Sequence, residues 1–232
     1  MSDSLSRKIK SVALVALLTI SSLSLAACTS GPKTPPSEAL VTAAVSTLHT
    51  LKNRTDLERF NAQLKNAAGG AIFPSVYKAG FFIGAEGGNG IMLAKDANGN
   101  WGYPAFYTLA SGSWGLQFGG QKSGMVFIIR SLGAVKALVK HQGKISADAN
   151  VTTGHVGTGL EGSITTNLGA DIIAYSDSKG LFGGISLGGS AMVRRNDFNA
   201  EYYGGQVGAE AILIQQAHQN PQADTLRQKL AE

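Results

Sequence analysis

Residues 71–121, AIFPSVYKAGFFIGAEGGNGIMLAKDANGNWGYPAFYTLASGSWGLQFGGQ, decide the fold. Apolar residues alternate here with small or polar ones, so that Trp114, Leu116 and Phe118 share one strand face. Because the side chains of a strand point to opposite faces in turn, this alternation predicts consecutive β-strands. Of the 30 glycines in the chain, 29 lie between residues 69 and 208, which indicates one domain over that span.

Residues 96–100, Asp-Ala-Asn-Gly-Asn, interrupt the alternation. They predict a β-hairpin turn, because Asn-Gly between apolar runs is a strong hairpin signal. The same residues fit the beginning of an EF-hand calcium loop. That loop requires glycine at its sixth position and glutamate at its twelfth, where this chain has Trp101 and Tyr107. We therefore expect a turn and no metal site.

Helical periodicity flanks the predicted sheet. Four segments carry apolar residues at helical spacing: 38–51, 55–68, 131–141 and 207–218. Ser37 and Ser131 are expected to cap the first and third helices, and Thr55 with Glu58 fits a capping box for the second. The predicted class is α+β: a twisted, glycine-rich antiparallel sheet, open or barrel-like, packed with amino-terminal, middle and carboxy-terminal helices.

The first 28 residues have the layout of a secretory signal peptide. Three cations within residues 7–10 precede an apolar run of about 15 residues, whereas a membrane-spanning helix needs roughly 20. The recognition residues Leu25, Ala26 and Ala27 before Cys28 resemble the bacterial lipobox, at which the cysteine is acylated and the leader removed. Cys28 is the only cysteine, so an intramolecular disulfide is excluded. An ordinary signal peptide followed by a chance cysteine is the alternative.

These features predict four parts: a signal peptide (1–27), a lipidated proline-rich tether (28–37), a domain (38–218) and a polar, frayed tail (219–232). Thr29 follows the cysteine in place of the aspartate that resembles an inner-membrane retention signal. We therefore expect a lipid anchor in the cell envelope, in the outer membrane facing the periplasm. Covalent lipid on Cys28 is the only non-protein group expected, with no other cofactor.

The balance of charge excludes nucleic acid as a partner. Removal of residues 1–27 takes three of the 20 cations and one of the 15 acids, which leaves 17 and 14 and a net charge of +3. A nucleic-acid interface needs cations concentrated on one face or helix. The first two predicted helices do carry a basic set that would face anionic phospholipid: Lys52, Arg54, Arg59 and Lys65. An ordinary solvated helix face is the alternative, because Asp56 and Glu58 are interspersed.

No catalytic site is predicted. The four histidines are scattered, and neither HExxH nor GxSxG occurs. Gly84, Gly87 and Gly90 are spaced by three, which fits neither a dinucleotide nor a Walker phosphate loop, and they are expected to shape a curved sheet. Four carboxylates could converge, but a capping or core role is expected for each: Glu86, Asp148, Asp171 and Asp177. We expect no enzymatic activity.

Several motifs, in order, resemble the SYLF domain over residues 38–218. They are AIFP at 71–74, GFFIGAEGG at 80–88, Trp101 with PAF at 104–106, GSWGLQ at 112–117, SDSKGLFGG at 176–184 and YYG at 202–204. Eukaryotic members of the family bind phosphoinositides and other anionic lipids, and some bind actin, while bacterial members resemble envelope lipoproteins. The amphipathic helix implicated in lipid binding in the family corresponds to the segment from Lys52 to Lys65.

The resemblance implies a membrane-anchored lipoprotein whose domain binds anionic phospholipid at the membrane surface. A scaffold that recognises another envelope protein, without lipid specificity, is the alternative. Actin is not expected as a partner, because a protein of a bacterial envelope would not meet it.

The lipid anchor is tested by Cys28→Ser. The substitution removes the thiol that would be acylated, so we expect the precursor to remain uncleaved and to incorporate no labelled palmitate during bacterial expression. Metabolic labelling followed by gel electrophoresis measures both effects, and Thr29→Ser serves as the control that keeps the thiol. Normal acyl labelling of Cys28→Ser would refute the lipobox.

Overall fold

The computed structural model describes residues 34–57, 59–80, 83–114, 119–140, 144–145, 151–153, 172–177 and 190–232. Cys28 and the expected signal peptide lie outside these residues, so their roles stay predictions. The chain divides into two units, Met1–Thr34 and Pro35–Glu232, and all described helices and strands belong to the second. Both hydrophobic core clusters also lie within Pro35–Glu232, so this unit carries its own core.

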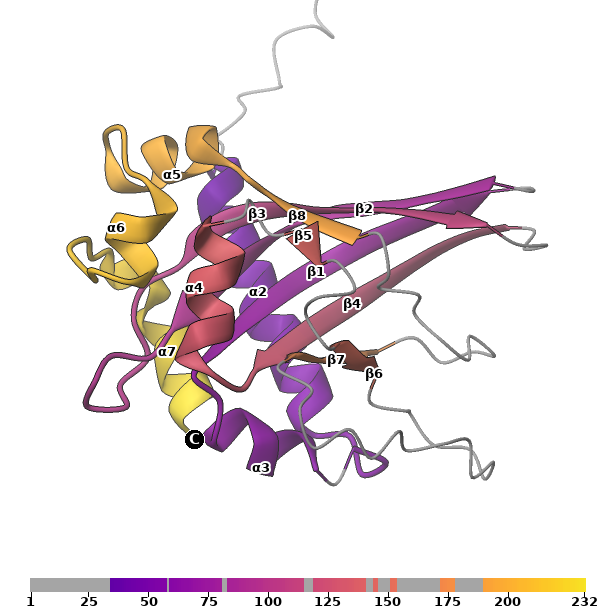
Figure 1. Ribbon diagram of the computed structural model, residues 1–232, viewed down its shortest axis with the longest axis horizontal. Coiled ribbons are helices and arrows are strands. Elements are labelled where there is room, and N and C mark those ends of the chain that lie inside the picture. Colours follow the sequence, from indigo (N-terminus) through magenta and orange to yellow (C-terminus); the bar gives the residue numbers. More distant parts are fainter. Residues whose placement is uncertain are drawn as a thin grey trace, which may run out of the picture. The chain divides into compact units, whose positions relative to one another are not determined.

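Four long antiparallel strands form the centre of the sheet (Figure 1): β1 (Gly69–Gly80), β2 (Ile83–Ala94), β3 (Ala105–Trp114) and β4 (Gly119–Ile129). Shorter strands extend it: β5 (Lys144–Ile145), β6 (Val151–Thr153), β7 (Ile172–Ser176) and β8 (Ser190–Arg194). The strand order is β5-β8-β3-β2-β1-β4-β7-β6, and β6 and β7 form the parallel pair. Among the described strands the sheet is open, because the two edge strands, β5 and β6, do not pair with each other. The predicted α+β class is confirmed, without barrel closure.

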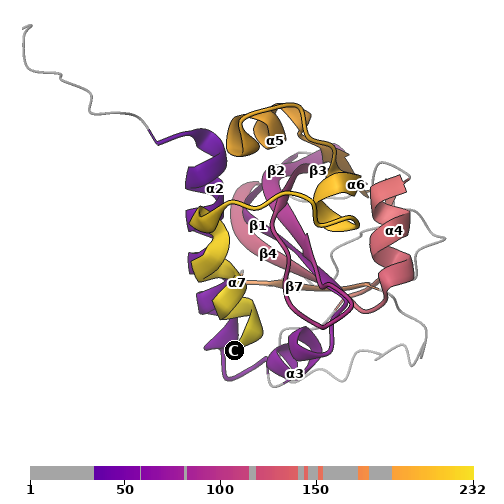
Figure 2. The ribbon, with the colours of Figure 1, turned by 90° about the vertical axis from the view of Figure 1, so that its left-hand side faces the viewer.

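Helices cover both faces of this sheet (Figure 2). On one face, α2 (Pro36–Lys52), α3 (Phe60–Lys65) and α7 (Asp224–Ala231) share one core cluster with strand residues such as Ile72. On the other, α4 (Leu132–Lys140) and α6 (Ala209–Leu213) share the second cluster with residues such as Phe73. The remaining helical elements are α5 (Asn196–Tyr203) and the short 3-10 helix η1 (Pro221–Ala223).

The predicted hairpin turn is confirmed in detail. Asp96 Oδ1 accepts hydrogen bonds of 2.8 Å from the backbone N–H groups of both Asn98 and Asn100. Gly99 has φ of +85°, a left-handed conformation that glycine adopts without strain. Hydrogen bonds from Asn100 and its neighbours lower the pKa of Asp96. Its carboxylate therefore holds the turn together.

Residues 83–94 form one continuous strand through a glycine-rich stretch. The neighbouring strand explains the glycines, because the register of β1 against β2 shifts between Ile72 and Tyr77. The displaced backbone of β1 lies against Gly88, where a side chain would not fit. Glycine at this position therefore lets β2 continue beside the irregular part of β1.

The helices differ from expectation mainly at their ends. Ser131 caps α4 as predicted, since its Oγ accepts a 3.1 Å hydrogen bond from Ala134 N–H. Ser37, by contrast, lies inside the first turn of α2, where its backbone N–H donates to Glu201. The second helix covers Phe60–Lys65 alone, and Glu58 of the expected capping box lies outside the described residues. The last predicted helix ends after Leu213.

The expected frayed end at residues 219–232 is wrong: the segment forms η1 and α7. Leu226 and Leu230, one helical turn apart, are 0% and 3% exposed and pack in the same core cluster as α2. Trp101 reinforces this contact, because its indole Nε1–H donates a 3.1 Å hydrogen bond to the Leu230 carbonyl. Two leucines in a polar segment are too weak a periodic signal to predict this helix.

Gly88→Ala tests whether the sheet needs this glycine for its shape. An added Cβ would lie 2.1 Å from the Ser75 carbonyl oxygen, so the backbone must shift. We expect a loss of about 1–3 kcal/mol in the free energy of unfolding, measured by urea denaturation. Gly205→Ala is the control, since nothing lies within 4 Å of its added Cβ. Equal stability of the two variants would contradict the packing argument.

Trp101→Phe tests the attachment of α7. The variant keeps an aromatic ring but removes the N–H donor, which leaves the Leu230 carbonyl without its partner. We expect a loss of about 1–3 kcal/mol in the free energy of unfolding and faster hydrogen exchange in α7. Tyr103→Phe, which removes a half-buried hydroxyl that donates to Asp224 and accepts from Arg227, should cost less because water can replace it. Unchanged exchange in α7 would show that the bond is not needed.

Candidate functional site

The apolar stripe of α2 and α3, the two helices beside the predicted lipid-binding cations, is buried in the protein core. Its members are all at most 2% exposed: Val41, Ala44, Leu48, Leu51, Phe60 and Leu64. They pack against the sheet in the same cluster as α7. In this fold the helices α2 and α3 therefore present only their polar faces to the surroundings, which rules out insertion of that stripe into a bilayer without undocking.

Two of the four predicted cations have partners in the fold. Lys52 Nζ donates a 2.8 Å hydrogen bond to the Lys229 carbonyl, which ties the end of α2 to α7, and burial lowers its pKa. Arg54 holds Asp56 through two hydrogen bonds and donates a third, of 3.3 Å, to the Ser176 carbonyl at the end of β7. Arg54 thus connects the α2–α3 loop to the sheet, and this is a structural task.

The other two predicted cations, Arg59 and Lys65, are exposed at opposite ends of α3. A cation that the sequence did not single out joins them. Lys95, at the end of β2, donates a 2.7 Å hydrogen bond from Nζ to the Lys65 carbonyl. We call the set Lys52, Arg59, Lys65 and Lys95 the basic end. None of the four has a carboxylate within ion-pair distance among the residues that the structure describes.

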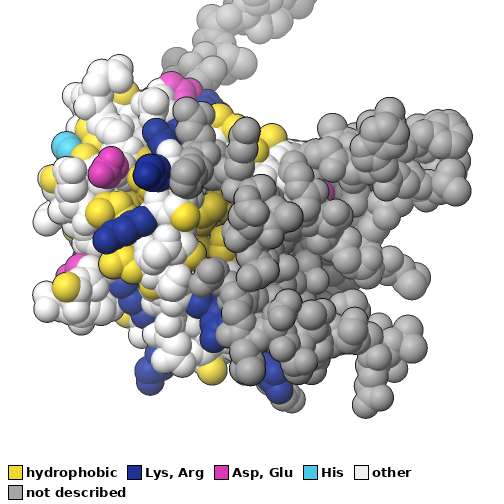
Figure 3. Space-filling model, viewed as in Figure 1, with side chains coloured by type: hydrophobic (Ala, Val, Ile, Leu, Met, Phe, Trp, Pro, Cys, Tyr) yellow, Lys and Arg dark blue, Asp and Glu magenta, His cyan; other side chains and the backbone are white. Residues whose placement is uncertain are grey.

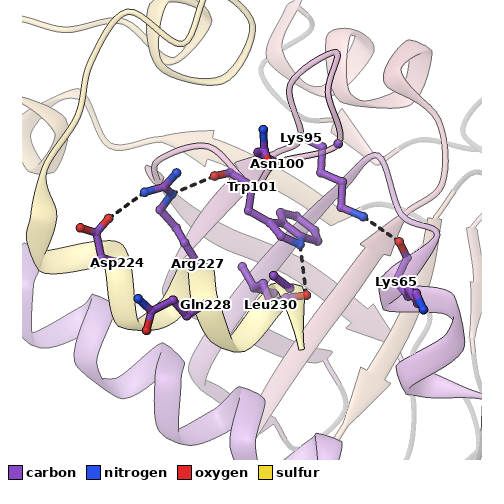
Figure 4. Close-up of a pocket in the computed structure, with 10 residues that line it drawn as sticks. Lys65, Lys95, Asn100, Trp101, Asp224, Arg227, Gln228 and Leu230 are labelled. Carbon is purple, nitrogen blue, oxygen red and sulfur yellow. Dashed lines mark hydrogen bonds and ion pairs between the residues drawn. The ribbon is translucent and has the colours of Figure 1, made fainter.

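A hollow of about 530 Å³ opens beside the basic end, between the 95–101 turn and α7 (Figure 4). Its lining includes Lys65, Lys95, Asn100, Trp101, Asp224 and Arg227, and we call it the Trp101 hollow. Lys95 Nζ lies 5.0 Å from the centre of the Trp101 ring, a cation–π contact. Burial lowers the pKa of Lys95.

The far wall of the Trp101 hollow is held by Arg227 of α7. Its Nε donates a 2.8 Å hydrogen bond to the Trp101 carbonyl, and Nη1 donates a 2.7 Å hydrogen bond to Asp224 Oδ1. The guanidinium also stacks on Tyr103, 4.1 Å from the ring centre. Sequence reasoning missed this site because residues 95–101 and 224–231 come together only through the docking of α7.

Other charged groups are dispersed. On the face shown in Figure 3, Lys and Arg side chains are separated by hydrophobic and uncharged ones. Asp177 accepts a 2.7 Å hydrogen bond from Gly124 N–H, while Asp148 and Asp171 lie outside the described residues. Within the described part of the chain, no group of three or more His, Cys, Asp or Glu could hold a metal ion. The same part contains no helix long and apolar enough to cross a bilayer.

Comparison with known proteins places this fold in a family. The model of the family described as "Ysc84: Las17-binding protein actin regulator" matches residues 110–232. The SH3 domain-containing YSC84-like protein 1 of Rattus norvegicus is 36% identical over 161 residues, which are 68% of this chain and 47% of that protein. The Homo sapiens protein of the same name is 34% identical over 161 residues, with the same two shares.

A yeast protein gives a similar match. The LAS seventeen-binding protein 3 of Saccharomyces cerevisiae (strain YJM789) is 34% identical over 167 residues, 70% of this chain and 36% of that protein. The chain thus spans about half, or less, of the length of these curated relatives. The match alone therefore does not show that this chain has the activities of the full-length relatives.

These comparisons correct one expectation. Actin was excluded as a partner because of the envelope location inferred from residues 1–28, which the structure does not describe. The matched family is described as an actin regulator, and its members include Las17-binding and SH3 domain-containing proteins, so the names point to protein partners. The exclusion is therefore wrong. Residues 110–232 make up more than half of the 232-residue sequence, and the chain belongs to the Ysc84 (SYLF) domain family.

Proposed function

We propose that the domain binds anionic phospholipid head groups at a membrane surface through the basic end. The observation that carries this proposal is a set of four cations, at the end of α2, at the two ends of α3 and just after β2, that form no ion pair with a carboxylate of the described residues. Burial lowers the pKa of Lys52, and Glu232 lies close enough to raise it again in part, so Lys52 is partly balanced. Cations compensated by nearby acids contribute little attraction to a charged surface, whereas uncompensated ones attract anions. Arg54 is left out of this set because Asp56 neutralises it.

The proposed mode of binding is electrostatic contact without insertion. Val41, Leu48 and Leu51 of α2 are buried in the core, so the domain offers head groups its polar face. Each basic residue near an anionic bilayer contributes about 1 kcal/mol, and the attraction falls off within a Debye length. Four such residues give weak, salt-sensitive attachment.

A covalent anchor would complement such weak attachment. We propose that lipid on Cys28 holds the protein in the cell envelope, in the outer membrane facing the periplasm. Stable anchoring needs two signals, such as more than one acyl chain or one chain with a basic patch. In this proposal the acylated Cys28 supplies attachment and the basic end supplies selection among lipids.

Binding of a protein partner is a second candidate function, favoured by the comparisons. Relatives at 34–36% identity carry the names LAS seventeen-binding and SH3 domain-containing, and the family is described as an actin regulator. Co-sedimentation of the Pro35–Glu232 unit with filamentous actin separates this candidate from the lipid proposal. Pelleting with actin, together with no preference for anionic vesicles, would favour the protein partner.

Vesicle flotation tests the lipid proposal on the unacylated Pro35–Glu232 unit. We expect it to float with vesicles of phosphatidylcholine mixed with phosphatidylglycerol and to stay unbound with phosphatidylcholine alone. Arg59→Glu combined with Lys65→Glu should weaken binding about 30-fold or more, because each lost cation removes about 1 kcal/mol and each new acid is repelled. Added salt should weaken binding of the unmodified unit.

The matched control changes the same charge on the other face of the sheet. Lys136→Glu combined with Lys140→Glu alters two exposed lysines of α4 and should leave flotation almost unchanged. If both double variants lose binding equally, attraction depends on net charge and the basic end has no special role. Binding that is no stronger to anionic than to neutral vesicles would refute the proposal altogether.

A further inference from the structure

We propose that the Trp101 hollow binds a phosphate monoester, carried either by a lipid head group or by a small soluble molecule. The lipid form of this inference rests on the proposed function and deepens it by naming the head-group site. The hollow itself is argued from its own residues, so the soluble form can hold even where membrane binding fails.

The charges that line the hollow match a dianion. Three cationic residues, Lys65, Lys95 and Arg227, line the hollow together with one acid, Asp224. Arg227 neutralises Asp224 through a 2.7 Å ion pair, which leaves the two lysine ammonium groups uncompensated among the described residues. A phosphate monoester has a second pKa of about 6 and carries nearly two negative charges at neutral pH. A carboxylate or a phosphate diester would neutralise only one of the two lysines.

Lys95, which lines the hollow, is held in place before any ligand binds. Lys95 Nζ donates one hydrogen bond to the Lys65 carbonyl and lies over the Trp101 ring. An ammonium group has three N–H donors, so two remain for phosphate oxygens. Burial lowers the pKa of Lys95, and a bound anion would raise it again by favouring the charged form.

The hollow is larger than a phosphate ion. Its volume of about 530 Å³ lies within the range of small-molecule sites, roughly 300–1,000 Å³. Leu230 and the Trp101 ring supply apolar wall, and the side-chain amide of Gln228 supplies polar wall. The geometry therefore fits a phosphate group that carries an organic alcohol, with the phosphate at the lysines and the alcohol part along α7.

Titration with glycerol 3-phosphate, followed by nuclear magnetic resonance of the Pro35–Glu232 unit, tests the inference. Trp101 is one of two tryptophans in the chain, and its indole N–H, bonded to Leu230, reports directly on the hollow. We expect a saturable shift of this resonance and of the Asn100 and Gln228 amides. Glycerol alone and glycerophosphoglycerol, a phosphate diester, should cause much smaller shifts at equal concentration.

Two variants connect the shift to the proposed ligands. Lys95→Gln should weaken glycerol 3-phosphate binding about tenfold or more, the usual cost of losing a charge-assisted hydrogen bond. Lys65→Gln, at an exposed side chain with no described partner, should weaken it without affecting folding. Lys136→Gln on α4 is the matched control and should leave the affinity unchanged.

Vesicles distinguish the two sources of the monoester. Phosphatidic acid exposes a phosphate monoester and phosphatidylglycerol a diester, so a head-group site predicts stronger flotation with phosphatidic acid at equal surface charge, lost in Lys95→Gln. Glycerol 3-phosphate binding without that preference assigns the hollow to a soluble ligand. Both results support the site.

The absence of a saturable shift at the Trp101 indole, or a shift that Lys95→Gln leaves unchanged, would overturn the inference. Failure of the proposed function would give a different result. The Arg59→Glu and Lys65→Glu double variant would then float like the unmodified unit, whether or not glycerol 3-phosphate shifts the Trp101 indole resonance.

Discussion

Strand β1 must bury both of its faces, and the rest of the domain depends on this constraint. It lies between β2 and β4 in the sheet, and its successive residues Ile72 and Phe73 belong to opposite core clusters. A strand with two apolar faces is stable only when a layer of helices covers each side. The chain supplies α2, α3 and α7 for one side and α4 and α6 for the other. Because α2 covers one face of the sheet, its apolar residues cannot insert into a bilayer while the helix is docked.

This commitment explains why cations that look equivalent in the sequence have different tasks. Lys52, Arg54, Arg59 and Lys65 fall within 14 residues and suggest one basic helical face. In the fold, Arg54 ties a loop to the end of β7, while Arg59 and Lys65 stay exposed on the short helix α3. Lys95 joins them from a distant strand, so the basic surface is a product of tertiary structure.

Local signals carried much of the prediction. Alternation within residues 71–121, the Asn-Gly turn and the capping of α4 by Ser131 depend on neighbours in the sequence, and they were predictable for that reason. The motifs that resemble the SYLF domain identified the family correctly. What could not be predicted depended on distant contacts: α7 has only two leucines to mark it, and the close approach of β1 that requires glycine at residue 88 comes from the irregularity in β1. The Trp101 hollow requires the 95–101 turn and α7, which are more than 120 residues apart, to lie together.

The hydrogen bond from Trp101 to Leu230 has a consequence for the energetics of the whole unit. It joins the 95–101 turn to the last helix, so the hollow between them exists only while α7 is docked. A ligand that binds the native arrangement alone stabilises it by RT ln(1 + [L]/Kd). Occupancy of the hollow and attachment of α7 are therefore thermodynamically linked. A change that loosens the helix weakens ligand binding, and a bound ligand makes local opening of the helix less favourable by the same free energy.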